Sequence, residues 1–199
     1  MVATFRVLVI CTANHCRSPI GEQLLAHDAR ERFGDRDSWL IESAGTNIPG
    51  RWPLHPYAAT VLGERLPAVA AHESVQMSPA LIGRSDLVLT ATRQHRSAVV
   101  STLPAAIGRT FTILQFARLC DQLQPISGVD TGDLGRDLVV QAKLARSLVQ
   151  PVPGEQDDLP DPMGKGVQEF RLCADRLQNS IDRILRPLTL RDSAEFRRP

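Results

Sequence analysis

The stretch FRVLVICTANHCRSPIG, residues 5–21, decides how the rest of the chain is interpreted. Its apolar run at residues 7–10 has the length and β-branched content of a buried parallel strand. Small and polar residues follow, and Ser18 and Pro19 then form a helix-start pattern. Proline suits the first helical turn, and a serine before it can cap free N–H groups. The stretch therefore predicts a strand, a short loop and a helix.

Cys11 and Arg17 stand at the two ends of the predicted loop. A short loop that closes onto a helix N-terminus turns its backbone N–H groups inward, and the helix dipole strengthens the resulting anion site. The same field favours the thiolate form of Cys11. The planar guanidinium of Arg17 matches two phosphate oxygens. A lone cysteine is more often a small buried residue, but this context predicts a nucleophile beside a bound phosphate.

Residues 11–19, CTANHCRSP, resemble the phosphate-binding loop of the low-molecular-weight protein tyrosine phosphatases. In that family the pattern is Cys, any five residues, Arg and Ser, near the N-terminus. The resemblance spans about residues 5–119 and resumes over residues 158–185, so the chain is identified as a bacterial-type member. It implies hydrolysis of phosphotyrosine in proteins through a phosphocysteine intermediate, without a cofactor. Inorganic phosphate and oxyanion inhibitors are expected to bind in the loop.

The chain length of 199 residues and the formal net charge of +1 fit one globular domain. We expect a single phosphatase domain over residues 1–187 and a flexible polar tail over residues 188–199. Residues 124–156 form an extended insertion, longer than the family usually has, to which the sequence assigns no role. The charge argues against a nucleic-acid or membrane-surface partner, because either would need a concentrated basic excess.

The four cysteines indicate a reducing compartment. They show neither the spacing of a zinc site nor the density of a secreted disulfide scaffold, so no metal is expected. The apolar run near the N-terminus is too short for a transmembrane helix and lacks the layout of a signal peptide. Since a catalytic thiolate must also stay reduced, the expected location is the cytoplasm. The four cysteines are Cys11, Cys16, Cys120 and Cys173.

Strand and helix patterns alternate along most of the chain. Strands are expected at residues 7–10, 39–41, 86–90 and 111–114. A surface loop is expected over residues 124–133. Helices are expected over residues 18–34, 56–65, 93–100, 116–123, 134–149 and 166–185, with a further helix start at residue 79. This order predicts a three-layer α/β fold with a four-stranded parallel sheet and helices on both faces. Ligands of such sheets bind beyond the carboxyl ends of the strands, where Cys11, Ser43 and Thr92 are expected.

A phosphocysteine mechanism also needs an acid that protonates the departing oxygen and later activates water. Acids in a loop rich in proline and glycine are usually only solvated. In the family, however, an Asp-Pro dipeptide before the last helix carries this acid, and Asp161 with Pro162 occupies that position. Asp161 is therefore the predicted general acid and base, and Asp158 is the reserve candidate.

Further residues are expected to bind phosphate or support the loop. Asn14 suits left-handed backbone angles, which asparagine tolerates better than most residues. Ser18 is placed to hydrogen-bond the Cys11 sulfur. The resemblance implies that Asn14 bonds to a serine and a histidine from neighbouring segments, and Ser43 and His72 fall at those positions. The full predicted set is Thr12, Ala13, Asn14, His15, Cys16, Ser18, Ser43 and His72.

The sequence departs from the family at three positions. Ala13 stands where the family has glycine, so the backbone there is expected to be either slightly strained or differently turned. Met163 stands where an aromatic residue usually stacks on the substrate ring, while Trp52 is a shifted candidate for the other cleft wall. His15 replaces a branched aliphatic residue, which goes with phosphotyrosine, or a threonine, which goes with protein arginine phosphatases. It is either a specificity determinant or a solvent-facing residue.

The resemblance also implies that Cys16 forms a reversible disulfide with Cys11, which protects the nucleophile from irreversible oxidation. Cys16→Ser enzyme should then be inactivated by peroxide faster than wild type, and thiol should restore only the wild type. Equal inactivation rates would contradict this hypothesis.

Three alternatives to a tyrosine phosphatase remain open. The first is a protein arginine phosphatase. The second is an arsenate reductase, which needs additional cysteines to relay a disulfide; Cys120 and Cys173 are expected to be buried and structural instead. The third is a weakly active phosphoprotein-binding module, for which the nucleophile and the acid would be superfluous.

Overall fold

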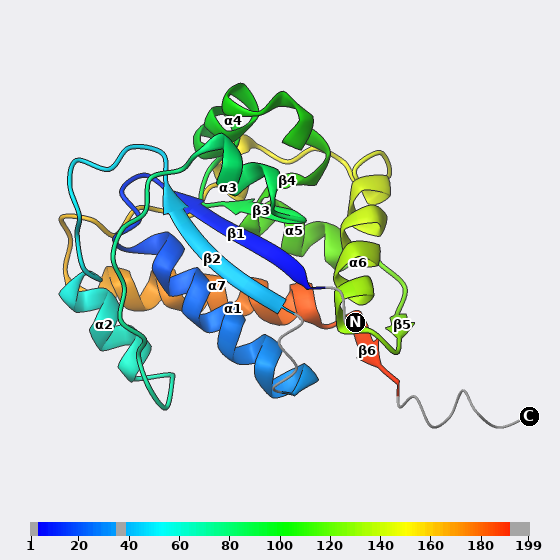
Figure 1. Ribbon diagram of the computed structural model, residues 1–199, viewed down its shortest axis with the longest axis horizontal. Helices are drawn as coiled ribbons and strands as arrows, with labels where there is room; N and C mark the ends of the chain where they lie inside the picture. Colours follow the sequence, from blue (N-terminus) through cyan, green and yellow to red (C-terminus); the bar gives the residue numbers. More distant parts are fainter. Residues whose placement is uncertain (1–3, 35–38, 192–199) are drawn as a thin grey trace, which may run out of the picture.

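A four-stranded parallel sheet forms the centre of the computed structural model, which describes residues 4–34 and 39–191 (Figure 1). The strand order is β2–β1–β3–β4. Their bounds are β1 Phe5–Cys11, β2 Trp39–Gly45, β3 Leu87–Thr90 and β4 Thr110–Thr112. Cys11 pairs with Gly45, and Ile10 pairs with Thr90, so the carboxyl ends of the strands meet at one edge. The predicted α/β class with a four-stranded parallel sheet is confirmed.

Helices cover both faces because alternate residues of β1 point to opposite sides. Val7 and Val9 pack into the larger core, whereas Leu8 and Ile10 pack into the smaller one. The larger core is covered by α1 Arg17–Phe33, α2 Pro56–Gly63, α5 Ile113–Cys120, α6 Thr131–Ala145 and α7 Val167–Leu185. The smaller one is covered by α3 Pro79–Gly83, α4 Arg93–Thr102 and the 3₁₀ helix η1 Pro104–Arg109.

The two Ser-Pro pairs behave differently at their helices. Ser78 caps α3, and its side chain accepts a hydrogen bond from the Leu81 N–H. Ser18 does not cap α1, because that helix already begins at Arg17, with Cys16 in the cap position. The expected capping role of Ser18 is therefore wrong. Its hydroxyl lies in the first turn and bonds to loop residues instead.

Residues 124–133, predicted as a surface loop, contain a short strand and the start of a helix. Ile126–Gly128 form a short strand, β5, and α6 begins at Thr131 with Asp130 as its cap. After the fourth strand, α5 begins at Ile113, since the Thr112 hydroxyl accepts a hydrogen bond from the Gln115 N–H. The predicted fourth strand therefore starts one residue and ends two residues too late.

The predicted start of the polar tail, at residue 188, is too early in the sequence. Leu188–Leu190 form strand β6, which pairs in parallel with β5 and fully buries Leu188. Three-residue strands are too short for a periodic pattern, and the partner strand lies far away in the sequence, so no local signal marks the pairing. Residues 192–199 of the expected tail lie outside the described residues.

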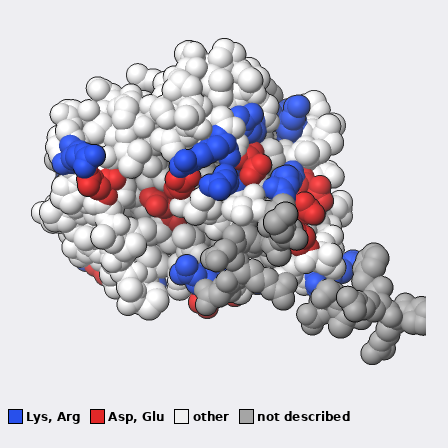
Figure 2. Space-filling model, viewed as in Figure 1, with Lys and Arg blue, Asp and Glu red and all other residues white. Residues whose placement is uncertain are grey.

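The molecular surface agrees with the near-neutral net charge. Figure 2 shows basic and acidic side chains intermixed across one face, with no large area of one sign on that face. Among the helices of the described ranges, none combines the length and the hydropathy that crossing a bilayer requires.

Candidate active site

The loop between β1 and α1, residues 11–17, forms a cradle in which backbone carbonyls are hydrogen-bonded and backbone N–H groups are left open. Its carbonyls face outward and are bonded: the Cys11 carbonyl accepts from the Thr46 N–H at 3.0 Å, and the His15 carbonyl accepts from the His55 N–H at 3.0 Å. The N–H groups of residues 12–16, in contrast, donate to no acceptor within the described part of the chain. A ring of open N–H groups before a helix N-terminus is an anion-binding nest.

Asn14 holds this cradle in shape. It has a φ of 51°, which confirms the expected left-handed conformation. Its Nδ2 donates to Ser18 Oγ at 2.9 Å and Ser43 Oγ at 2.7 Å, and its Oδ1 accepts from the Val75 N–H at 2.7 Å. The His72 Nε2–H donates to the Asn14 carbonyl at 2.7 Å. The contacts that the resemblance implied for Asn14, Ser43 and His72 are thus present, and Val75 adds one that the sequence did not reveal.

The end of β2 touches the cradle directly. A Cβ at Gly45 would lie 2.5 Å from the Thr12 carbonyl oxygen, so only glycine permits this approach. Ala13 shows no corresponding strain. Among the described residues other than glycine, positive φ is confined to Asn14. The expectation of a strained backbone at Ala13 is wrong, because the left-handed turn falls on the next residue.

Arg17 connects the cradle to the loop before α7. Its side chain is almost fully buried; Nη1 donates to the Leu159 carbonyl at 3.2 Å and Nη2 to Asp161 Oδ2 at 2.6 Å. Half of the Asp161 side chain is exposed, and its Oδ1 accepts from the Met163 N–H at 3.1 Å. The reserve candidate Asp158 points elsewhere, since its Oδ1 accepts from the backbone N–H at the start of α4.

The Cys11 sulfur lies 3.0 Å from Ser18 Oγ, as the sequence predicted. All four cysteines are free and buried. Burial, with smaller effects from nearby charged groups, raises the pKa of the Cys16 and Cys173 thiols to about 12, and burial raises that of Cys120 as well. Cys120 and Cys173 pack in the core, as expected of structural cysteines.

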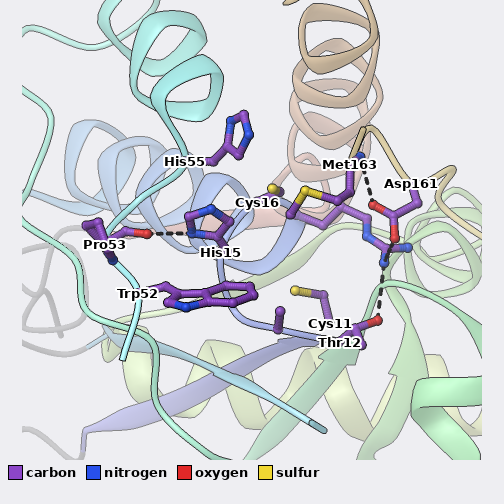
Figure 3. A pocket seen from close by; sticks show the side chains of 11 residues that line it. Cys11, Thr12, His15, Cys16, Trp52, Pro53, His55, Asp161 and Met163 are labelled. Atoms are coloured by element: carbon purple, nitrogen blue, oxygen red, sulfur yellow. Dashed lines mark hydrogen bonds and ion pairs between the residues drawn. The ribbon is translucent and has the colours of Figure 1, made fainter. Parts of the chain in front are cut away.

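A pocket of about 580 Å³ opens above the cradle. Figure 3 shows Cys11 near its floor, Trp52 on one side, and Asp161 with Met163 on the other. The structure therefore places both predicted cleft residues, Trp52 and Met163, at the pocket. Most of the remaining lining was predicted too, but Pro53 and His55 were not; the lining comprises Cys11, Thr12, Ala13, His15, Cys16, Arg17, Trp52, Pro53, His55, Asp161 and Met163.

His15 belongs to an aromatic group at the pocket wall. Its Nδ1–H donates to the Pro53 carbonyl at 2.5 Å, and its ring lies 5.2 Å from Trp52 and 5.1 Å from His55. His55 in turn stacks on Phe170 at 4.6 Å. Burial and the neighbouring His15 lower the pKa of His55, which favours its neutral form. His15 is therefore a fixed part of the wall.

Two ionisable residues that the sequence did not reveal, the buried His95 and the half-buried Glu22, support the cradle from behind. His95 Nε2 lies 2.9 Å from Thr12 Oγ1, and its Nδ1 lies 2.7 Å from Thr92 Oγ1. Burial, aided by the nearby Arg17 charge, lowers the pKa of His95 to about 4. Glu22 accepts from the Ser43 hydroxyl at 2.5 Å, and burial raises its pKa. No motif spacing marks either residue.

A cysteine in an anion-binding cradle, at the carboxyl edge of a parallel α/β sheet, defines a class of proteins that handle phosphate. The sequence model described as "Low molecular weight phosphotyrosine protein phosphatase" matches residues 6–126, more than half of the chain. The chain belongs to this family and is a phosphatase.

Relatives of two kinds resemble the chain. A protein-arginine-phosphatase from Geobacillus stearothermophilus is 26% identical over 184 residues, which are 92% of this chain and 96% of the relative. The low molecular weight protein-tyrosine-phosphatase Etp from Escherichia coli is 30% identical over 110 residues, 55% of this chain and 70% of the relative. The solved structure of the YwlE arginine phosphatase from Geobacillus stearothermophilus matches with a TM-score of 0.66 and 26% identity, covering 92% of this chain and 91% of that one.

Proposed function

We propose that this enzyme removes phosphate from phosphotyrosine in proteins through a phosphocysteine intermediate at Cys11. The observation that carries the proposal is the ring of open N–H groups at residues 12–16, which surrounds a cysteine and is closed by a buried arginine. The half-exposed carboxylate of Asp161 reaches the same pocket. These groups supply an anion site, a nucleophile and an acid within one cavity.

In the first step the Cys11 sulfur attacks phosphorus, the S–P bond forms and the P–O bond to the substrate breaks. Asp161 gives its proton to the departing oxygen. In the second step Asp161 takes a proton from water, whose oxygen attacks phosphorus and releases the Cys11 sulfur. The inward N–H groups and Arg17 hold the equatorial oxygens in both steps. Since the thiolate must stay reduced, we place the enzyme in the cytoplasm.

The pocket walls support an aryl substrate. Trp52 offers an aromatic surface on one side, and Met163 offers a flexible apolar one on the other. Phosphoarginine is the second candidate, because two protein-arginine-phosphatases are among the relatives, one of them matched over 92% of this chain. Comparison of kcat/KM for otherwise identical phosphotyrosine and phosphoarginine peptides tests the choice. Preference for phosphoarginine would replace the first substrate with the second.

The catalytic proposal is tested with Cys11→Ser. We expect turnover of an aryl phosphate to disappear, while calorimetry still detects inorganic phosphate in the cradle, because the N–H groups and Arg17 remain. Retained turnover would contradict the phosphocysteine. Thiol-dependent arsenate reduction without aryl phosphate hydrolysis would favour the reductase, and phosphate binding without wild-type turnover would favour the binding module.

A further inference from the structure

A second cavity, of about 310 Å³, lies at the other end of the loop that carries Asp161. It opens between the first turns of α4 and α5, the end of α6 and residues 149–157, a segment that belongs largely to the insertion (Figure 1). None of its lining residues lines the pocket above the cradle. Four arginines and one acid line it: Arg93, Arg96, Arg118, Arg146 and Asp157.

Only one of these arginines has an acidic partner among the described residues. Arg118 Nη2 donates to both carboxylate oxygens of Asp157, at 3.1 and 3.2 Å. Arg96 Nε and Arg146 Nη2 instead converge on a single backbone carbonyl, that of Thr110, at 3.0 and 2.6 Å. Arg146 also donates to the Ile107 carbonyl at 3.4 Å and lies 3.8 Å from the centroid of the Phe111 ring. These neutral partners carry no full negative charge, so neither guanidinium is neutralised.

Arg93 adds a third uncompensated charge. Its side chain makes no hydrogen bond or ion pair within the described ranges, and its guanidinium rests against Gly154, where any Cβ would clash. Burial and Arg96 lower the pKa of Arg146 to about 10, and burial with Arg93 lowers the pKa of Arg96. Burial, the larger cause, and the neighbouring guanidinium both disfavour the charged forms of these side chains, and a bound anion would stabilise them.

The surrounding backbone adds to the positive potential. Arg93 and Arg96 lie in the first turn of α4, and Thr112 and Gln115 lie at the start of α5, so two helix N-termini meet at the cavity. Helix N-termini favour acidic side chains; neither first turn contains one, and the N-terminus of α4 is met by Asp158, which accepts from the Arg93 N–H at 2.7 Å. The charge of the lining is thus predominantly positive, with one acid beside four arginines.

We propose that this cavity binds a small phosphate-class anion with two or more negative charges, such as a diphosphate, at a site separate from the cradle. Guanidinium groups bind phosphate oxygens through paired, charge-assisted hydrogen bonds. Arg93, Arg96 and Arg146 together carry the charge that such an anion would neutralise. The cavity volume suits a free small anion.

The occupant would also contact the base of the acid loop. Arg118 pairs with Asp157, and the Arg93 N–H donates to Asp158 at 2.7 Å, three residues before Asp161. Binding should therefore alter the amide NMR signals of Asp157 and Asp158 together with those of Arg96 and Gln115.

The test is an amide NMR titration of the full chain with methylenediphosphonate, which a phosphatase cannot cleave. In wild type we expect two separate groups of shifts, one at residues 11–18 and one at residues 93–96, 112–115 and 157–158. Arg96→Gln combined with Arg146→Gln should weaken the affinity for methylenediphosphonate, measured from the second group of shifts, at least tenfold. This is the order expected from losing charge-assisted hydrogen bonds. The matched control is Arg84→Gln, which removes one exposed, ion-paired arginine on α3's C-cap and should leave both groups unchanged.

Arg93→Gln covers the case in which the double variant does not fold, since Arg93 is exposed and makes no side-chain bond in the described ranges. Arg93→Gln should weaken the affinity for methylenediphosphonate, measured from the second group of shifts, several-fold. Absence of the second group at millimolar diphosphonate would overturn the site, as would shifts there that persist in both Arg93→Gln and the double variant. The proposed catalytic function is tested separately, because Cys11→Ser enzyme, which lacks the nucleophile, should show the same second group.

Discussion

The cradle and the acid loop, residues 157–163, face the same pocket but are held very differently. Asn14, Cys11 and Arg17 of the cradle are 0%, 3% and 5% exposed, and four segments of the chain hydrogen-bond to the cradle. In the acid loop, by contrast, the Asp161 side chain is half exposed. The loop is fixed at its start, where Asp157 pairs with Arg118, Asp158 accepts from the Arg93 N–H, and the Leu159 N–H donates to the Ala91 carbonyl at 2.8 Å.

Because of this difference, we assign anion binding to the rigidly held cradle and proton transfer to the more exposed acid loop. The cradle's N–H groups are held open by buried contacts, so phosphate binding needs little rearrangement there. Asp161 is held by Arg17, whose guanidinium is also the phosphate ligand in the proposed mechanism. A substrate would therefore loosen this ion pair as it enters and leave the carboxyl group free to act on the departing oxygen. Substitutions in the cradle should change stability and anion affinity, whereas substitutions in the acid loop should change turnover.

The largest predicted effect of an acid-loop substitution is that of Asp161→Asn. It should lower kcat for phenyl phosphate by about 10²–10⁴-fold, because the leaving oxygen loses its proton donor. With a nitrophenyl phosphate, whose leaving group needs less protonation, the loss should be much smaller. Urea unfolding should show a loss of no more than about 1–2 kcal/mol, because the asparagine oxygen can still accept a hydrogen bond from Arg17.

Asp158→Asn is the matched control for this prediction, because Asp158 lies in the same loop and anchors the start of α4. It should not show the dependence on the leaving group. If Asp158→Asn showed that dependence and Asp161→Asn did not, the acid would be assigned to the wrong residue.

The next effect concerns the cradle. Asn14→Ala removes the hydrogen bonds to Ser18, Ser43 and Val75 and places alanine at positive φ. Buried groups left without partners should lower the free energy of unfolding by about 2–4 kcal/mol. Phosphate affinity should fall as well. The control Asn179→Ala, on the exposed side of α7, should change stability by less than about 0.5 kcal/mol. A stable Asn14→Ala enzyme with normal phosphate affinity would show that the cradle does not need this residue.

The sequence predicted the cradle better than it predicted the supporting residues. Strand, loop and helix are contiguous at residues 5–33, so the spacing of Cys11 and Arg17 already implies their geometry. The order of strands and helices placed Ser43 at the carboxyl edge of the sheet, but its bond to Asn14 and the role of His72 could be predicted only from the family resemblance. His95 and Glu22 could not be predicted, because their contacts depend on how α4 and α1 pack against the sheet. The same reason explains β6, whose partner is set by tertiary packing and not by local pattern.

The smallest predicted effect is a pH dependence that belongs to the cradle and not to the acid loop. His95 has a pKa of about 4 in the folded protein, because it is buried and lies near Arg17. Its pKa in the unfolded chain is about 6.5. Between these values the unfolded state binds more protons, so acid favours unfolding and stability falls as the pH drops from about 6.5 to about 4. The total loss is at most about 3 kcal/mol.

His95→Gln should remove this loss while keeping a hydrogen bond toward Thr12. Urea unfolding at pH 7.5 and pH 5 checks the prediction: the wild type should lose more stability between the two values than the variant does. His27→Gln, on α1 and away from the cradle, is the control and should behave as wild type. Parallel losses in wild type and His95→Gln would mean that His95 does not contribute to the pH dependence. Glu22 could not account for that loss, because its pKa is raised in the folded protein and protonation of its carboxyl group therefore favours the folded state.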